Sequence, residues 1–125
     1  MKLHGLELLV VVVCLALVGC ALPRHSEQGI RQQMLSKTPI GSSYAVVLGF
    51  AKKKGWPVDE QHQGYVVPEV GKSYAQSKIV GDHLISAYLG GYLVFLGHTD
   101  VDCIWVFDDQ DKLIDVFVDK QTDSL

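Results

Sequence analysis

The stretch Val101-Asp102-Cys103-Ile104-Trp105-Val106-Phe107 alternates along its length as a β-strand with one buried face does. Asp108–Lys112 follows as an Asp-rich turn, and Leu113–Val118 is a second alternating run. Two such runs across a short turn predict a β-hairpin. One face of the first strand carries Val101, Cys103, Trp105 and Phe107, and the second strand sets Ile114, Val116 and Val118 opposite Leu113, Asp115 and Phe117.

Upstream of this hairpin, the apolar residues of Ile79–Phe95 predict a further strand, which Gly90-Gly91 interrupts. Two glycines inside a strand indicate a bulge or a sharp bend. This strand and the hairpin together form an antiparallel meander. The polar stretch Pro57–Ser77 is expected to be loop apart from a short strand near Tyr65–Val67.

Two helices are expected before the strands. Ser42–Lys54 has apolar residues at helical spacing, a serine suited to the N-cap, lysines in the last turn and Gly55 at the stop. Glu27–Lys37 is a weaker helix, which Thr38-Pro39 ends. A sheet this small needs a covering element. The predicted fold class is therefore α+β, with one or two helices packed on a three- to four-stranded antiparallel β-meander.

The N-terminus has the layout of a secretory signal, with Lys2 before the apolar run Leu8–Val18. Leu17-Val18-Gly19-Cys20 resembles the bacterial lipobox, in which the Cys is acylated and becomes the first mature residue. The expected organisation is a lipoprotein signal peptide at 1–19, the lipidated Cys20 with a tether at 20–26, and a single α+β domain at 27–125. Ala21 after the Cys favours the outer membrane, with the domain facing the periplasm.

Two other interpretations of the N-terminus remain open. The first is a membrane-spanning helix, although such a helix needs about 20 apolar residues and this run has roughly half that number. Ordinary signal cleavage after the small-x-small triplet Gly19-Cys20-Ala21 is the second.

Charge and cysteine content limit the classes of function. The net charge of −3 argues against nucleic acid, which needs a basic surface. Cys14 leaves with the signal and Cys20 is acylated, so Cys103 has no partner for an intramolecular disulfide. Its apolar neighbours favour burial over an intermolecular bond.

Short motifs carry a resemblance to a known family. These are Gln28-Gly29, the Gly41-Ser42 helix opening, and the closing hairpin Trp105-x-Phe107-Asp108…Lys112-Leu113-Ile114-Asp115-Val116. Over about residues 28–119 the chain resembles the small outer-membrane lipoproteins of the SmpA/OmlA group, also called BamE-like. The β-lactamase-inhibitor-like domains share that layout. The resemblance implies helices on a three-strand meander and a role in the cell envelope.

No catalytic, cofactor or metal site is expected. Asp100-Val101-Asp102 precedes Cys103 and would raise the pKa of the thiol, which opposes nucleophilic chemistry. His62, His83 and His98 form no i,i+4 pair of metal ligands. Glu69–Ser73 ends in Gly-Lys-Ser, as a phosphate-binding loop does. The first Gly of such a loop would have to be at position 66, which is Val66 in this chain.

The acidic C-terminal third suggests a docking face for a basic protein partner, with Asp109, Asp111 and Asp115 as candidate residues. The alternative is a solvated turn whose charges block edge pairing. The expected function is a non-enzymatic envelope lipoprotein that presents its domain to a protein partner in cell-envelope assembly or maintenance. The other candidate is an inhibitor or immunity-type protein that inserts the Pro57–Ser77 loop into an enzyme.

Overall fold

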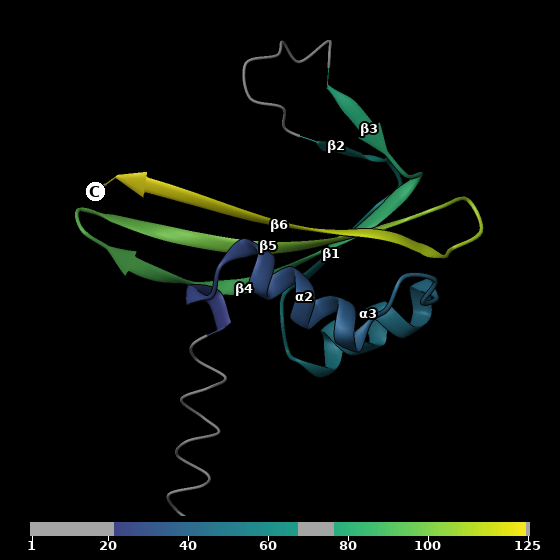
Figure 1. Ribbon diagram of the computed structural model, residues 1–125, viewed down its shortest axis with the longest axis horizontal. Helices are drawn as coiled ribbons and strands as arrows, with labels where there is room; N and C mark the ends of the chain where they lie inside the picture. Colours follow the sequence, from purple (N-terminus) through teal and green to yellow (C-terminus); the bar gives the residue numbers. More distant parts are fainter. Residues whose placement is uncertain (1–21, 68–76, 125) are drawn as a thin grey trace, which may run out of the picture.

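The chain forms a four-stranded antiparallel sheet with helices on one face, shown by a computed structural model that describes residues 22–67 and 77–124 (Figure 1). The strand order is β1-β4-β5-β6. Strands β4, β5 and β6 are consecutive neighbours, so the predicted meander and the α+β class are confirmed. The strands are β1 (Val58–Gln61), β4 (His83–Val94), β5 (Gly97–Phe107) and β6 (Leu113–Ser124).

Both predicted helices are present, as α2 (Glu27–Lys37) and α3 (Tyr44–Lys53). Each begins at a serine, because the Ser26 and Ser43 side chains accept hydrogen bonds from free backbone N–H groups of the first turn. The chain leaves α3 through Gly55, whose φ of +76° suits a residue without a Cβ.

The stretch Pro57–Ser77 contains more structure than expected. Its predicted strand is β2 (Tyr65–Val67), but Val58–Gln61 also forms β1 at the edge of the main sheet. The prediction of loop there was wrong, because three of the four β1 residues are polar and only pairing with β4 makes them a strand. Residues 68–76, which include the whole of Glu69–Ser73, lie outside the described part of the chain.

The predicted strand Ile79–Phe95 is divided in two. Lys78–Val80 forms β3, which pairs with β2 as a separate ribbon, and β4 begins only at His83. Gly81 makes this turn with a φ of +74° and lies so close to Val106 that a Cβ would be 2.3 Å from its side chain.

Two β-bulges set which side chains face the helices. The first, at Tyr88/Gly90, is the irregularity predicted from Gly90-Gly91. The second lies between Val106 and Phe107. Val106 pairs with Asp115 and Phe107 pairs with Leu113, so Ile114 is the extra residue. The strict alternation predicted for 113–118 was therefore wrong, and Leu113 packs in the same cluster as Val116.

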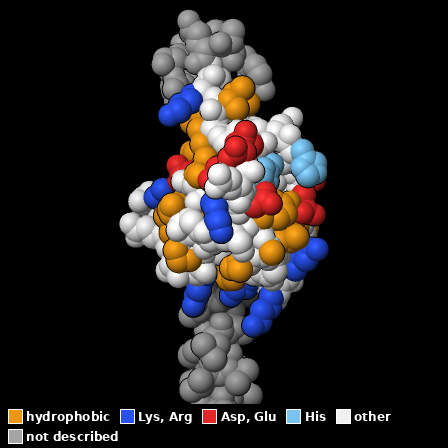
Figure 2. Space-filling view, turned by 90° about the vertical axis from the view of Figure 1, so that its right-hand side faces the viewer, with side chains coloured by type: hydrophobic (Ala, Val, Ile, Leu, Met, Phe, Trp, Pro, Cys, Tyr) orange, Lys and Arg blue, Asp and Glu red, His pale blue; other side chains and the backbone are white. Residues whose placement is uncertain are grey.

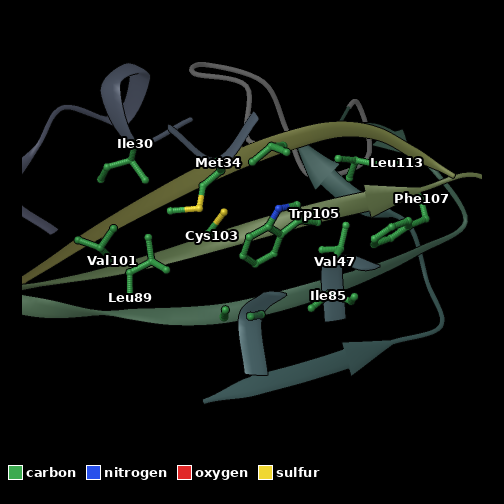
Figure 3. Packing of buried hydrophobic residues seen from close by; sticks show 13 residues of the cluster. Ile30, Met34, Val47, Ile85, Leu89, Val101, Cys103, Trp105, Phe107 and Leu113 are labelled. Atoms are coloured by element: carbon green, nitrogen blue, oxygen red, sulfur yellow. The ribbon is translucent and has the colours of Figure 1, made fainter. Parts of the chain in front are cut away.

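The main core lies between the helices and the sheet, and Trp105 is its largest fully buried side chain (Figure 3). Trp105 is on the predicted inner face of β5, and Cys103 is buried beside it as expected. From the helices, Ile30, Met34, Val47 and Ala51 contribute to this cluster.

A second, smaller cluster covers part of the opposite face of the sheet. Leu84, Ile104 and Val106 form it, and the β2–β3 ribbon packs on them through Tyr65 and Val80. The Tyr65 ring lies 4.7 Å from the Phe117 ring between their centroids. The sheet is thus covered by helices on one side and by a short ribbon on the other.

The N-terminal part of the domain begins earlier than residue 27. Leu22–Arg24 forms a 3₁₀ helix, η1, in which Pro23 is buried and Leu22 packs against the main core. The described part of the expected tether is thus attached to the fold. The expected signal peptide and Cys20 lie outside the described residues. Within the described ranges, no helix has the length and apolar character to cross a membrane.

Candidate functional site

The Asp108–Lys112 turn at the end of the β5–β6 hairpin is internally ordered. Asp108 Oδ1 accepts hydrogen bonds from the backbone N–H groups of Gln110 and Lys112, each at 2.9 Å. Asp111 takes a positive φ of +59°, which Asp tolerates better than most residues. The turn therefore holds its shape through its own side chains.

This turn exposes the first two candidate partner residues, Asp109 and Asp111. In Figure 2 the end of the molecule that carries the turn shows acidic side chains gathered beside histidine, with several Lys and Arg side chains below them. Among the described residues, no hydrogen bond or ion pair engages the Asp109 carboxylate. Asp109 is therefore the candidate residue that an external cation could reach without displacing a partner.

Asp111 is engaged by a histidine from the neighbouring strand. His83 Nε2 lies 2.6 Å from Asp111 Oδ1, an ion pair when His83 is protonated, although the angle is not that of a hydrogen bond. The His83 ring stacks on Phe107 at 9° between planes and 5.6 Å between centroids. The histidine thus couples the turn to the rim of the core.

Tyr44 and Glu60 extend this polar cluster. Tyr44, the first residue of α3, donates a hydrogen bond from its hydroxyl to Glu60 Oε1 at 2.5 Å, and its ring lies 5.4 Å from that of His83. Burial and the hydrogen bond to Glu60 raise the pKa of Tyr44. The sequence did not predict this grouping, because Glu60 belongs to the unpredicted strand β1.

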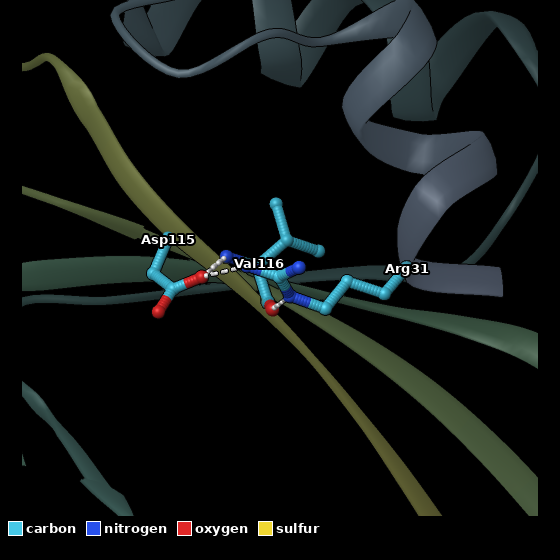
Figure 4. Close-up of polar contacts among 3 residues, drawn as sticks. All are labelled: Arg31, Asp115 and Val116. Carbon is cyan, nitrogen blue, oxygen red and sulfur yellow. Dashed lines mark hydrogen bonds and ion pairs between the residues drawn. The ribbon is translucent and has the colours of Figure 1, made fainter. Parts of the chain in front are cut away.

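The third candidate residue, Asp115, is placed differently, on the sheet-edge strand β6. Figure 4 shows Arg31 reaching from α2 to this strand, where its guanidinium donates to Asp115 Oδ1 at 2.9 Å and to the Val116 carbonyl at 3.0 Å. Asp115 Oδ1 also accepts from the Val116 backbone N–H. The structure therefore groups Asp109 and Asp111 on one turn, and it joins Asp115 to α2.

An open groove of about 560 Å³ lies beside this ion pair, between the start of α2 and the middle of β6. It is lined by Ser26, Glu27, Gln28, Arg31, Val116, Phe117 and Val118. Since Arg31 already occupies the Val116 carbonyl, this part of the β6 edge is not free to pair with another strand.

The Cys103 thiol is buried inside the main core, in the cluster that contains Trp105. Burial, with a smaller effect of Asp102, raises the pKa of the Cys103 thiol, so the thiolate is disfavoured. In the described part of the chain, no three side chains of His, Cys, Asp or Glu come together as metal ligands. We find no match to this chain among family models, curated proteins or solved structures.

Proposed function

We propose that this protein is a non-enzymatic envelope lipoprotein, attached to a bacterial membrane through acylated Cys20, that presents the acidic turn to a basic protein partner. The outer membrane, facing the periplasm, is the proposed location. The observation that supports docking is the ordered, exposed turn at Asp108–Lys112. A turn already held by its own hydrogen bonds loses little conformational freedom on binding.

The position of the turn is consistent with this proposal. β5 has 11 residues, so it separates the turn from the opposite end of the sheet by about 35 Å. The η1 helix packs on β4 near Gly90, in the half of that strand remote from the turn. A domain attached near Leu22 would therefore hold the acidic turn away from its anchor.

The membrane attachment is tested with Cys20→Ser. The variant should be released from the membrane fraction with an unchanged melting temperature, since the described fold begins at Leu22. Stable attachment needs more than one acyl chain, and the substitution removes the acylated residue. Retention of the variant on membranes after a high-salt wash would reject the lipobox assignment.

The docking face is tested by capture of partners from detergent-solubilised envelope. Asn substitution of Asp109, Asp111 and Asp115 should weaken capture and flatten its dependence on salt, because surface charge mainly sets encounter rate and specificity. Asp109→Asn alone is the sharper variant, since it breaks no intramolecular contact among the described residues. Gln substitution of Lys52–Lys54 is the matched control and should leave capture intact. The opposite result would place the working surface at the end of α3.

A further inference from the structure

The tip of the β4–β5 hairpin consists of apolar side chains exposed to solvent. Phe95 is 93% exposed, Leu93 69% and Leu96 67%, and Val94 is also partly exposed. We name Leu93–Leu96 the apolar tip. Single exposed apolar residues are ordinary on soluble domains, whereas a contiguous exposed group marks an interaction site.

The backbone of this turn makes its composition more unusual. Phe95 and Leu96 are the two residues between the paired ends Val94 and Gly97, and Leu96 has a φ of +57°. Two-residue hairpin turns favour Asn and Gly because those residues accept positive φ, whereas a bulky side chain is disfavoured there. The geometry of the turn therefore does not explain why Phe95 and Leu96 occupy it, and these two side chains are expected to have a function.

A cationic and aromatic group lies immediately behind the apolar tip. The Tyr92 ring has the Arg24 guanidinium 5.1 Å from its centroid and the Lys120 ammonium 5.3 Å from it. Lys120 also donates to the His25 carbonyl at 2.6 Å, which holds the segment after η1 against β6. Tyrosine and long cationic side chains above an apolar segment are typical of a membrane–water interface. The acidic Asp123 is also near, opposite His98 on the neighbouring strand.

The apolar tip and η1 lie on the same half of the β4–β5 hairpin. Pro23 packs beside Gly90, where a Cβ would be 3.2 Å from its ring. Cys20 precedes Leu22 by two residues in the sequence, a length of chain that can span at most about 7 Å. A lipid attached at Cys20 would therefore bring this half of the hairpin close to the bilayer.

We infer that the apolar tip inserts into the lipid bilayer, with Tyr92, Arg24 and Lys120 at the level of the anionic headgroups. This inference rests on the proposed membrane attachment and adds a second, non-covalent contact. Two contacts with the bilayer restrict the rotation of the domain about its anchor. The acidic turn, at the opposite end of β5, then points away from the membrane.

The test uses the full chain, purified from membranes and reconstituted in vesicles of phosphatidylethanolamine and phosphatidylglycerol. A Phe95→Trp variant reports on the tip, and Ile79→Trp is the matched control, because Ile79 is 66% exposed but lies on β3. Spectra of the parent protein are subtracted to remove Trp56 and Trp105. We expect Phe95→Trp to shift its emission to shorter wavelength and to be quenched by brominated lipid several-fold more strongly than Ile79→Trp.

Each other result has a defined meaning. Quenching of Phe95→Trp no stronger than that of Ile79→Trp, in protein that stays with vesicles, overturns the inference and leaves the proposed attachment standing. A shift that occurs without lipid and grows with protein concentration overturns it in favour of a second copy on the tip. Lipid quenching in protein whose Cys20 is shown by mass spectrometry to be unmodified supports tip insertion and rejects the lipoprotein assignment. Protein that does not bind vesicles at all rejects both.

Discussion

Trp105 donates a hydrogen bond from its indole Nε1 to Thr38 Oγ1 at 3.0 Å, and both side chains are fully buried. The Thr38 hydroxyl in turn donates to the Met34 carbonyl at 2.6 Å, near the end of α2. The Thr38 hydroxyl therefore adds a second hydrogen bond to the Met34 carbonyl, which also accepts from the Thr38 backbone N–H at 2.7 Å. The same hydroxyl satisfies the indole N–H, the only polar group of the Trp105 side chain. This contact joins the last turn of α2 to the middle of β5.

Replacing Thr38 with Val should destabilise the fold, because the shape is kept while the indole N–H loses its acceptor. An unsatisfied buried donor costs about 1–3 kcal/mol. Thr38→Ser keeps the hydroxyl and should cost less, about 0.8 kcal/mol for the missing methyl group. Urea unfolding of both variants measures the difference. A Val variant as stable as the Ser variant would mean that the bond contributes nothing.

Trp105→Ala should lower the free energy of unfolding by about 3–5 kcal/mol, because removing a fully buried aromatic side chain leaves a cavity in a small core. That is a large part of the stability of a domain of this size. Trp56→Ala is the matched control, because Trp56 stacks on Trp105 from a half-buried position and should cost less. Thermal melts of the two variants test the order, and equal losses would contradict the central role of Trp105.

Gly81 and Gly55 provide a comparison at nearly equal backbone geometry, with φ of +74° and +76°. A Cβ at Gly55 meets nothing within 4 Å, whereas one at Gly81 would lie 2.3 Å from Val106 and 2.8 Å from the Phe107 carbonyl. Gly55→Ala should therefore lower the free energy of unfolding only by the cost of placing an alanine in a left-handed backbone conformation, about 1–2 kcal/mol. Gly81→Ala should lower the free energy of unfolding clearly more, and urea unfolding of the two variants measures the difference. Similar costs would show that β3 and β4 can separate to admit the methyl group.

Asp102→Asn should stabilise the protein at neutral pH. Asp102 pairs directly across the strands with Asp119, and like charges in that position cost about 0.2–1 kcal/mol. Burial, followed by the charges of Asp119 and Asp100, raises the pKa of Asp102. The folded state therefore holds the Asp102 proton more tightly than the unfolded state does. This binding stabilises the fold fully below the pKa of the unfolded state, and the stabilisation is lost as the pH rises through the pKa of the folded state.

Melting temperature as a function of pH checks this sign. Wild type and Asp102→Asn should melt at nearly the same temperature at about pH 3, below the usual Asp pKa of about 3.9, and the variant should melt higher above that range. Asp119→Asn removes the same repulsion and should also stabilise at neutral pH. A variant that is less stable than wild type at pH 7 would mean that the Asp102 carboxylate has a favourable partner.

Parts of the candidate site could be foreseen from the sequence and other parts could not. The Asp108–Lys112 turn, with Asp109 and Asp111 exposed on it, follows from local composition between two alternating runs. The pairing of Asp111 with His83, and of Asp115 with Arg31, joins residues far apart in the chain, and no local pattern encodes it. The predicted strand Ile79–Phe95 included all of the apolar tip except Leu96, and only its exposure showed that Phe95 lies outside the core.

Local signals in the sequence were enough to predict several elements of the fold. Serine caps, helical spacing and Gly55 place α3, and strand alternation places Trp105 inside, because these depend on neighbours within a few residues. Tertiary structure alone decided that Val58–Gln61 becomes a strand, that Ile114 is a bulge, and that Gly81 separates β3 from β4. Those features arise where one segment pairs with or packs closely against a distant one, and the free energy that selects them comes from that contact.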